Sequence, residues 1–179
     1  MDGSRTMLSH NRPRSRGFTL IEAAITTVIV GVGILATMSL FAACSQQNMN
    51  ASEMTTAMML ATNVQEAMAN MSFSDPIMGK TTFGPEGGEV LGSFDDVDDW
   101  DGQTINPPID AFRAPVSNMS QYSQVVTVDP IDMNNLSLVL PKTVLNRAAV
   151  RVRVRVLFQP VAGASSEEVY RTDWVRTER

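Results

Sequence analysis

The sequence contains little cysteine and histidine, the residues that form disulfides, bind zinc and serve most often as general bases. It has a single cysteine, Cys44, and a single histidine, His10. One cysteine cannot form a disulfide within the chain, and in an apolar run a thiol usually serves as a small hydrophobic group. The sequence also has no zinc-ligand spacing and no phosphate-binding glycine loop. We therefore do not expect an enzyme.

Charge is almost absent from one long segment. Residues 18–44 carry one charged side chain, Glu22, and directly follow the basic stretch RPRSRG. About 20 apolar residues span a bilayer as a helix, so we expect a membrane-spanning helix with the arginines on the cytoplasmic side. The segment is longer than the apolar part of a secretory signal, about 7–15 residues. A carboxylate inside it is costly and indicates a function.

The residues around this carboxylate carry a family resemblance. Arg16-Gly17-Phe18-Thr19-Leu20-Ile21-Glu22 resembles the cleavage and methylation motif of bacterial type IV prepilins and type II secretion pseudopilins. The resemblance implies that a prepilin peptidase cuts after Gly17 and methylates Phe18. It also implies that Glu22 pairs with the N-terminal amine of Phe18 in a neighbouring subunit and so sets the register of assembly.

Two other interpretations of the segment stay open. It could be an uncleaved single-pass anchor, in which Glu22 reaches the membrane surface by snorkelling. It could also undergo lipoprotein processing at Cys44, where Ala42 and Ala43 suit the cleavage site. Phe41 fits that site poorly, and the apolar stretch before it is longer than the usual 7–15 residues or so.

The rest of the chain divides into segments of different character, and together they predict an α+β fold. We expect a cleaved leader (1–17), a membrane-spanning helix that also forms the filament core (18–44), an amphipathic continuation of this helix (45–71) and a globular head (72–179). Within the head, residues 72–120 predict an acidic loop and residues 121–179 an antiparallel sheet. The helix continuation shows apolar residues at helical spacing: Met49, Ala57, Leu60, Val64, Met68 and Met71.

Methionines are frequent in this continuation. Thioethers bind soft copper ions, so a metal-binding set is one interpretation of Met54, Met58, Met59, Met68 and Met71. Without a nearby histidine or second thiol, packing in the core or between subunits is the interpretation that we prefer.

Five aspartates stand within seven positions of the acidic loop: Asp95, Asp96, Asp98, Asp99 and Asp101. We expect a solvated acidic loop, with a nonstandard Ca²⁺ site as the alternative. An EF-hand alignment fails because Val97 and Pro108 fall where acidic ligands are required. The segment loosely resembles an aspartate-rich loop of some minor pilins.

The C-terminal part predicts strands at 122–128, 136–140, 148–158 and 168–176, with turns at Asp129-Pro130 and Asn134-Asn135. Strict alternation in 148–158 places valines on one sheet face, toward the helix, and Arg151, Arg153 and Arg155 on the other. The last two strands should form a hairpin. The arginines could pair with Glu167, Glu168 or Asp173, be solvated, or contact a neighbouring subunit or DNA.

These features predict a structural subunit, a minor pilin or pseudopilin. Its partners would be a prepilin peptidase, other pilin or pseudopilin subunits and the inner membrane, with the head exported and the mature chain in a periplasmic or cell-surface filament. The alternatives are a filament-displayed module that binds DNA or a surface ligand, and a plain single-pass membrane protein. Without the leader the formal charge is about −8, which disfavours nucleic acid as a partner.

Overall fold

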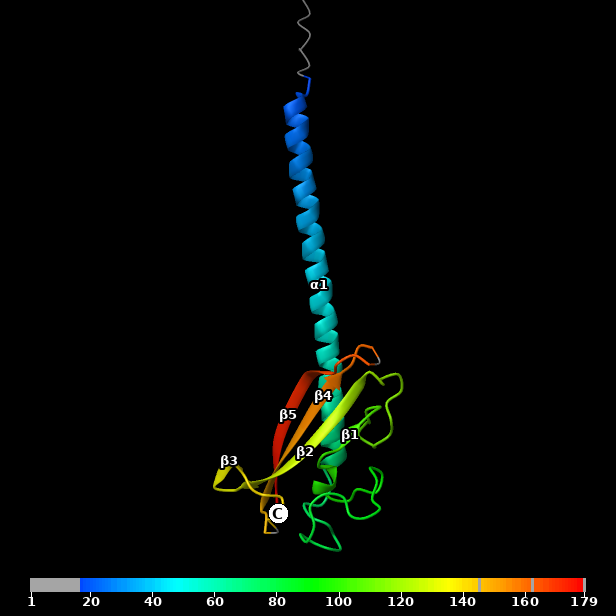
Figure 1. The fold of residues 1–179 in the computed structure, drawn as a ribbon, viewed down its shortest axis with the longest axis vertical. Coiled ribbons are helices and arrows are strands. Elements are labelled where there is room, and N and C mark those ends of the chain that lie inside the picture. Colours follow the sequence, from blue (N-terminus) through cyan, green and yellow to red (C-terminus); the bar gives the residue numbers. More distant parts are fainter. Residues whose placement is uncertain (1–16, 145, 162, 179) are drawn as a thin grey trace, which may run out of the picture. The chain divides into compact units, whose positions relative to one another are not determined.

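The elements of the fold follow the predicted order from a long helix to a sheet. The computed structural model describes residues 17–144, 146–161 and 163–178, so residues 1–16 of the predicted leader lie outside the described part. The elements are helix α1 (Leu20–Met68), the 3-10 helix η1 (Asp98–Trp100) and strands β1 (Thr104–Ile105), β2 (Tyr122–Asp132), β3 (Asn135–Val139), β4 (Ala149–Phe158) and β5 (Glu167–Thr177) (Figure 1). This α+β layout confirms the predicted fold class.

The start of α1 is set by a capping residue. The Thr19 hydroxyl accepts the backbone N–H of Glu22 at 3.3 Å, and the Thr19 carbonyl accepts the N–H of Ala23 at 3.1 Å. Threonine followed three residues later by glutamate is the pattern of a capping box, which satisfies N–H groups that have no partner inside the helix. The helix therefore begins directly after the predicted cleavage position.

Hydroxyl groups in the apolar part of α1 are satisfied within the helix. Each donates to the carbonyl four residues earlier, at 2.7–2.9 Å: Thr26, Thr27, Thr37 and Ser39. A hydroxyl that is already bonded can enter an apolar environment at little cost. These polar residues therefore do not conflict with the predicted insertion into a membrane.

The chain separates into two units, one ending at Gln47 and the other beginning at Asn48. In the second unit, one face of α1 packs on the sheet. The buried residues on the helix are Ala57, Leu60, Ala61, Val64 and Met68. Most of the predicted apolar face is thus confirmed, but Met49 is 58% exposed.

The sheet is antiparallel throughout, in the order β1-β2-β4-β5, with β3 paired to the end of β2. Figure 1 shows β2, β4 and β5 side by side across the C-terminal part of α1. The valines of β4 predicted to face the helix are buried in one core with its apolar side chains: Val150, Val152, Val154 and Val156. The predicted hairpin of the last two strands is confirmed by the β4–β5 pairing.

One predicted turn is wrong. Residues 129 and 130 do not end the first long strand, since β2 continues to Asp132. A proline lacks only the N–H donor. The Pro130 carbonyl still accepts the N–H of Leu140 at 2.8 Å, and Pro130 stays paired with Val150. The reversal falls instead between β2 and β3, close to the predicted second turn.

The methionines of α1 and the residues just after it occupy two environments. Met68 is 1% exposed, and Met71 packs against the same core. Met54, Met58 and Met59 are 49%, 45% and 46% exposed. Core packing therefore accounts for the first two, while packing of the other three against another subunit stays a prediction.

Candidate functional site

The predicted processing and assembly residues lie together at the beginning of α1. Gly17 and Phe18 precede the helix, and Phe18 is 71% exposed. Glu22 lies in the first helical turn and is exposed. A helix N-terminus carries a partial positive charge, so an acidic residue is electrostatically favoured there. Glu22 therefore fits its local position even before any partner is considered.

The helix that follows exposes its apolar side chains. Every residue from Gly17 to Ser52 is exposed, including Ile21 at 69%, Leu35 at 67% and Phe41 at 75%. Among the described residues, α1 is the one helix long and apolar enough to cross a membrane by length and composition. Exposed apolar surface of this extent indicates a site of contact with lipid or protein.

The predicted solvated acidic loop is wrong at its centre. Asp96, Asp98 and Asp99 are 2%, 3% and 1% exposed. Backbone N–H groups make this burial tolerable: Asp96 Oδ1 accepts those of Asp98 and Asp99 at 2.8 and 3.2 Å, and Asp99 Oδ2 accepts those of Asp95 and Asp96 at 3.0 and 3.2 Å. These reciprocal bonds fold residues 95–99 into a tight turn, which we call the acidic turn.

A buried ion pair connects the acidic turn to a distant segment. Arg147 donates to Asp98 Oδ1 at 2.7 Å, with the two side chains 0% and 4% exposed. The Gly84 N–H donates to Asp98 Oδ2 at 3.1 Å, and the Arg147 guanidinium lies 4.9 Å from the centre of the Phe83 ring. Sequence reasoning missed Arg147, because its partner lies 49 residues away and no local pattern marks it.

The other two aspartates of the predicted Ca²⁺ set, Asp95 and Asp101, lie in different environments. Asp101 Oδ1 accepts the Val128 N–H at 3.0 Å, and Asp101 Oδ2 pairs with Lys142 at 2.5 Å. Asp95 is exposed. Among the described residues, the metal-ligating side chains that come within 4.8 Å of one another are instead Glu86, Glu89 and Asp99. The structure thus does not bring the five aspartates together as one ligand set.

Burial shifts the pKa values of the carboxyl groups in the acidic turn. It raises the pKa of Asp96 to about 8, with help from the neighbouring charges of Asp98 and Asp99. It also raises the pKa of Asp99 to about 6, to which Glu89 and Glu86 contribute. For Asp98, burial raises the pKa and the Arg147 guanidinium opposes the shift. Burial therefore favours the protonated forms of Asp96 and Asp99 over their charged forms.

Trp100 anchors this turn in the core. Its ring lies edge-on to Phe94, with centroids 5.8 Å apart, and the Arg113 guanidinium lies 5.6 Å from its centre. Its indole Nε1–H points to the sulfur of Met71 at 3.1 Å. The motif FDDVDDWDG thus joins the end of α1, the sheet and the preceding loop.

The arginines of β4 are largely engaged within the chain. Arg153 pairs with Asp173 at 3.3 Å, directly across the β4–β5 ladder, and Arg155 approaches Glu168 at 3.7 Å. Arg151 donates to the Leu136 carbonyl. Pairing therefore holds for Arg153 and Arg155, and the charges left for an acidic partner or DNA are reduced.

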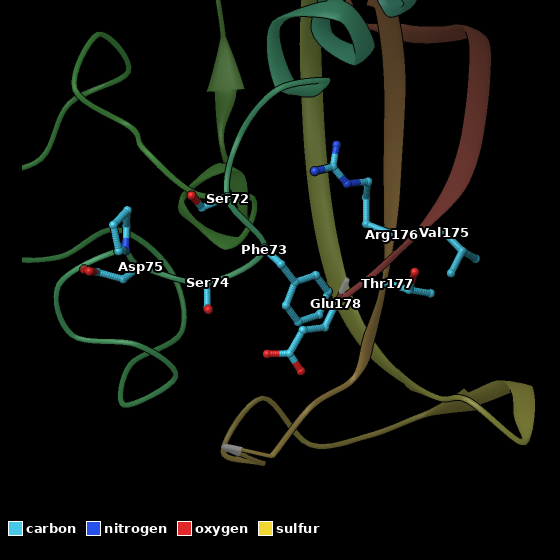
Figure 2. A pocket seen from close by; sticks show the side chains of 9 residues that line it. Ser72, Phe73, Ser74, Asp75, Val175, Arg176, Thr177 and Glu178 are labelled. Atoms are coloured by element: carbon cyan, nitrogen blue, oxygen red, sulfur yellow. The ribbon is translucent and has the colours of Figure 1, made fainter.

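A pocket of about 580 Å³ lies beside the end of α1, lined by residues 72–76 and 175–178 (Figure 2). Its main cation, Arg176, donates to the carbonyls of Met68, Ala69 and Met71 at 2.8–3.0 Å. Glu178 pairs with Lys80 at 2.5 Å. The charged groups of the pocket thus stabilise the fold: Arg176 caps the C-terminus of α1, and Glu178 forms an ion pair.

Among the described residues, the N-terminal part of α1 is exposed and apolar, which indicates contact with lipid or with other proteins. The family model for the prokaryotic N-terminal methylation motif matches residues 12–38. No curated protein and no solved structure matches the chain. The matched segment carries the signature of type IV pilins and pseudopilins. The motif implies processing by a prepilin peptidase and assembly with other pilins.

Proposed function

We propose that this chain is a minor pilin or pseudopilin, a structural subunit that assembles into a filament through the exposed part of α1. The observation that supports this most directly is the continuous exposure of residues 17–52, which overlap the methylation motif at residues 12–38. Such a surface is unfavourable in water and becomes favourable in lipid or against neighbouring helices. The subunit would wait in the inner membrane, with its N-terminus in the cytoplasm, before it joins the filament.

In this proposal, Glu22 lets the same helix occupy first the membrane and then the filament. Cleavage after Gly17 would create a positive amine on Phe18, four residues before the carboxylate. In a filament the amine of one subunit would pair with Glu22 of its neighbour. A buried charge without its partner is strongly unfavourable, so misaligned subunits would be rejected. The pair would therefore select the register of assembly.

Processing is tested by expressing the chain with and without a prepilin peptidase and measuring intact mass. We expect loss of residues 1–17 and a methylated Phe18, whereas Gly17→Val should leave the leader attached. Persistence of the full chain with an active peptidase would support a plain anchor and contradict the proposal. A mature N-terminus at Cys44 would contradict it in favour of lipoprotein processing.

The role of Glu22 is tested with Glu22→Gln, which keeps the size of the side chain and removes the charge. We expect unchanged membrane insertion and a more than tenfold fall in incorporation into filaments, equivalent to about 1.4 kcal/mol or more. Crosslinking of neighbouring subunits in isolated filaments, followed by quantitative immunoblotting, measures incorporation.

Thr19→Ala is the matched control, because it removes the helix cap at a cost of about 1 kcal/mol to the helix but keeps the charge. Its incorporation should stay close to that of the parent. Equal losses in the two variants would mean that Glu22 acts through the capping box, and the charge-pair role would then be wrong.

A further inference from the structure

Three carboxylates from two segments meet beside the acidic turn of the head. Glu86 and Glu89 come from the preceding loop and Asp99 from η1, and their carboxylate oxygens lie within 4.8 Å of one another. Glu86 and Glu89 are partly buried, and Asp99 is 1% exposed. Like charges at this spacing repel strongly where water is largely excluded. The cluster therefore favours a positive charge at its centre.

The local sequence holds the two glutamates in place. Glu86-Gly87-Gly88-Glu89 forms a tight turn, in which the Glu89 N–H donates to the Glu86 carbonyl at 3.1 Å. The Glu86 N–H donates back to Glu89 Oε2 at 3.1 Å. Gly88 has a φ of 102°, which only glycine adopts readily. The turn thus directs two acidic side chains toward Asp99 from a constrained backbone.

Two of the three carboxylates keep a buried oxygen that receives no hydrogen bond within the described part of the chain. Asp99 uses Oδ2 for backbone N–H groups, while its Oδ1 is buried and unpaired. Glu86 uses Oε1 for the Thr82 hydroxyl at 2.5 Å, while its Oε2 is buried and unpaired. Buried polar atoms are almost always satisfied, and an unsatisfied carboxylate oxygen is particularly costly.

Basic side chains do not account for these oxygens. The buried Arg147 is bonded to Asp98, and Arg113 donates to the carbonyls of Leu91 and Phe94. None of the ion pairs among the described residues involves Glu86, Glu89 or Asp99. The ion pairs among the described residues therefore supply no positive charge to the cluster.

We propose that Glu86, Glu89 and Asp99 bind a Ca²⁺ ion, with Asp99 Oδ1 and Glu86 Oε2 as ligands. Ca²⁺ binds oxygens at about 2.3–2.6 Å, so two ligands of one ion lie up to about 5 Å apart. The 4.8 Å spacing fits this limit. Water would complete the 6–8 ligands that Ca²⁺ takes. The set shares only Asp99 with the one predicted from the sequence.

The chemistry of the site favours Ca²⁺ over other common ions. All three side chains offer hard oxygen ligands, whereas structural zinc prefers sulfur and nitrogen. Mg²⁺ requires near-ideal octahedral geometry at about 2.0–2.1 Å and gives up water reluctantly, while Ca²⁺ tolerates irregular sites. A bound ion would join the loop at 84–90 to η1 and so stabilise the part of the head that has least regular structure.

The test is titration of CaCl₂ into the full chain, purified in detergent micelles and treated with EDTA, followed by isothermal calorimetry and thermal unfolding. We expect one Ca²⁺ per chain and a rise in the unfolding midpoint on binding, because a ligand of the folded state stabilises it. Tb³⁺ provides a second readout: it should bind the same site, be sensitised by Trp100 beside Asp99, and be displaced by Ca²⁺.

Glu86→Gln and Glu89→Gln keep side-chain size and remove one charge each. We expect each to weaken Ca²⁺ binding at least tenfold. In EDTA both variants should unfold at a higher temperature than the parent, because repulsion is relieved. In Ca²⁺ this order should reverse. Asp99→Asn is avoided as the main test, since Asp99 also holds the acidic turn through its backbone bonds.

Asp95→Asn is the matched control, because Asp95 is an exposed carboxylate of the same acidic motif outside the cluster. It should bind Ca²⁺ as the parent does. Absence of binding at 10 mM CaCl₂, unchanged affinity in both glutamine variants, or loss of binding in Asp95→Asn alone would each overturn the site. Equal affinity for Mg²⁺ would overturn the choice of ion.

Discussion

The N-terminal part of α1 and the acidic turn of the head place their side chains in opposite ways. From Gly17 to Ser52 the helix exposes apolar residues, such as Leu35 at 67% and Phe41 at 75%. The acidic turn buries carboxylates, with Asp96, Asp98 and Asp99 at most 3% exposed. Each arrangement is unfavourable by itself, because water solvates carboxylates well and apolar surface poorly.

The two regions differ in which groups offset the unfavourable exposure or burial of their side chains. The acidic turn finds most of it inside the chain, in backbone N–H groups and in Arg147. The N-terminal part of α1 finds none among the described residues, since the apolar window that qualifies the helix to cross a membrane is 0% buried. An element whose side chains find partners within the chain stabilises the fold. An element whose side chains require partners outside the chain is where we expect function. This contrast can be tested by mutation.

The largest effect is expected from removing the internal partner of the acidic turn. Arg147→Met would leave Asp98 buried without its cation, and we expect a loss of about 3–5 kcal/mol in the free energy of unfolding. Urea unfolding of the full chain in micelles, followed by tryptophan fluorescence, measures it. Asp98→Asn combined with Arg147→Met should cost less than the sum of the single changes. A loss below about 1 kcal/mol would show that the pair does not hold the turn.

Two leucines of the same helix compare the regions directly. Leu60 is 0% exposed and Leu35 is 67% exposed. Leu60→Ala should lower the free energy of unfolding by about 2–5 kcal/mol, because it opens a cavity in the core. Leu35→Ala should change it by less than about 0.5 kcal/mol. Thermal unfolding of both variants in micelles measures the two losses. Similar losses would contradict the division of α1 into an exposed N-terminal part and a buried C-terminal part.

The smallest effect is expected on the outer face of the sheet. Arg153 and Asp173 are 32% and 39% exposed at their side chains, so Arg153→Ala should cost about 0.2–1 kcal/mol. The difference should shrink in 1 M NaCl, where screening acts over about 3 Å. Asp173→Ala is the matched control and should behave alike. A loss as large as that of Arg147→Met would mean that exposure does not separate the two arginines.

Most of the fold was predictable because it follows local periodicity. Alternation in β4 identified the buried valines, and helical spacing identified Leu60, Val64 and Met68. The strand through Pro130 was not predicted, because turn propensity at that position is overridden by pairing with β4. The processing motif was readable because its residues are adjacent in the chain.

The sequence by itself determined that an apolar segment with one carboxylate follows a basic stretch and overlaps a methylation motif, because these features depend only on neighbouring residues. Only the tertiary structure decided which charges are buried. Asp98 meets a cation 49 residues away, and Asp99 meets Glu86 and Glu89 across a loop. Whether a carboxylate is solvated, paired or available to a metal depends on distant partners, and no local pattern in the chain specifies them.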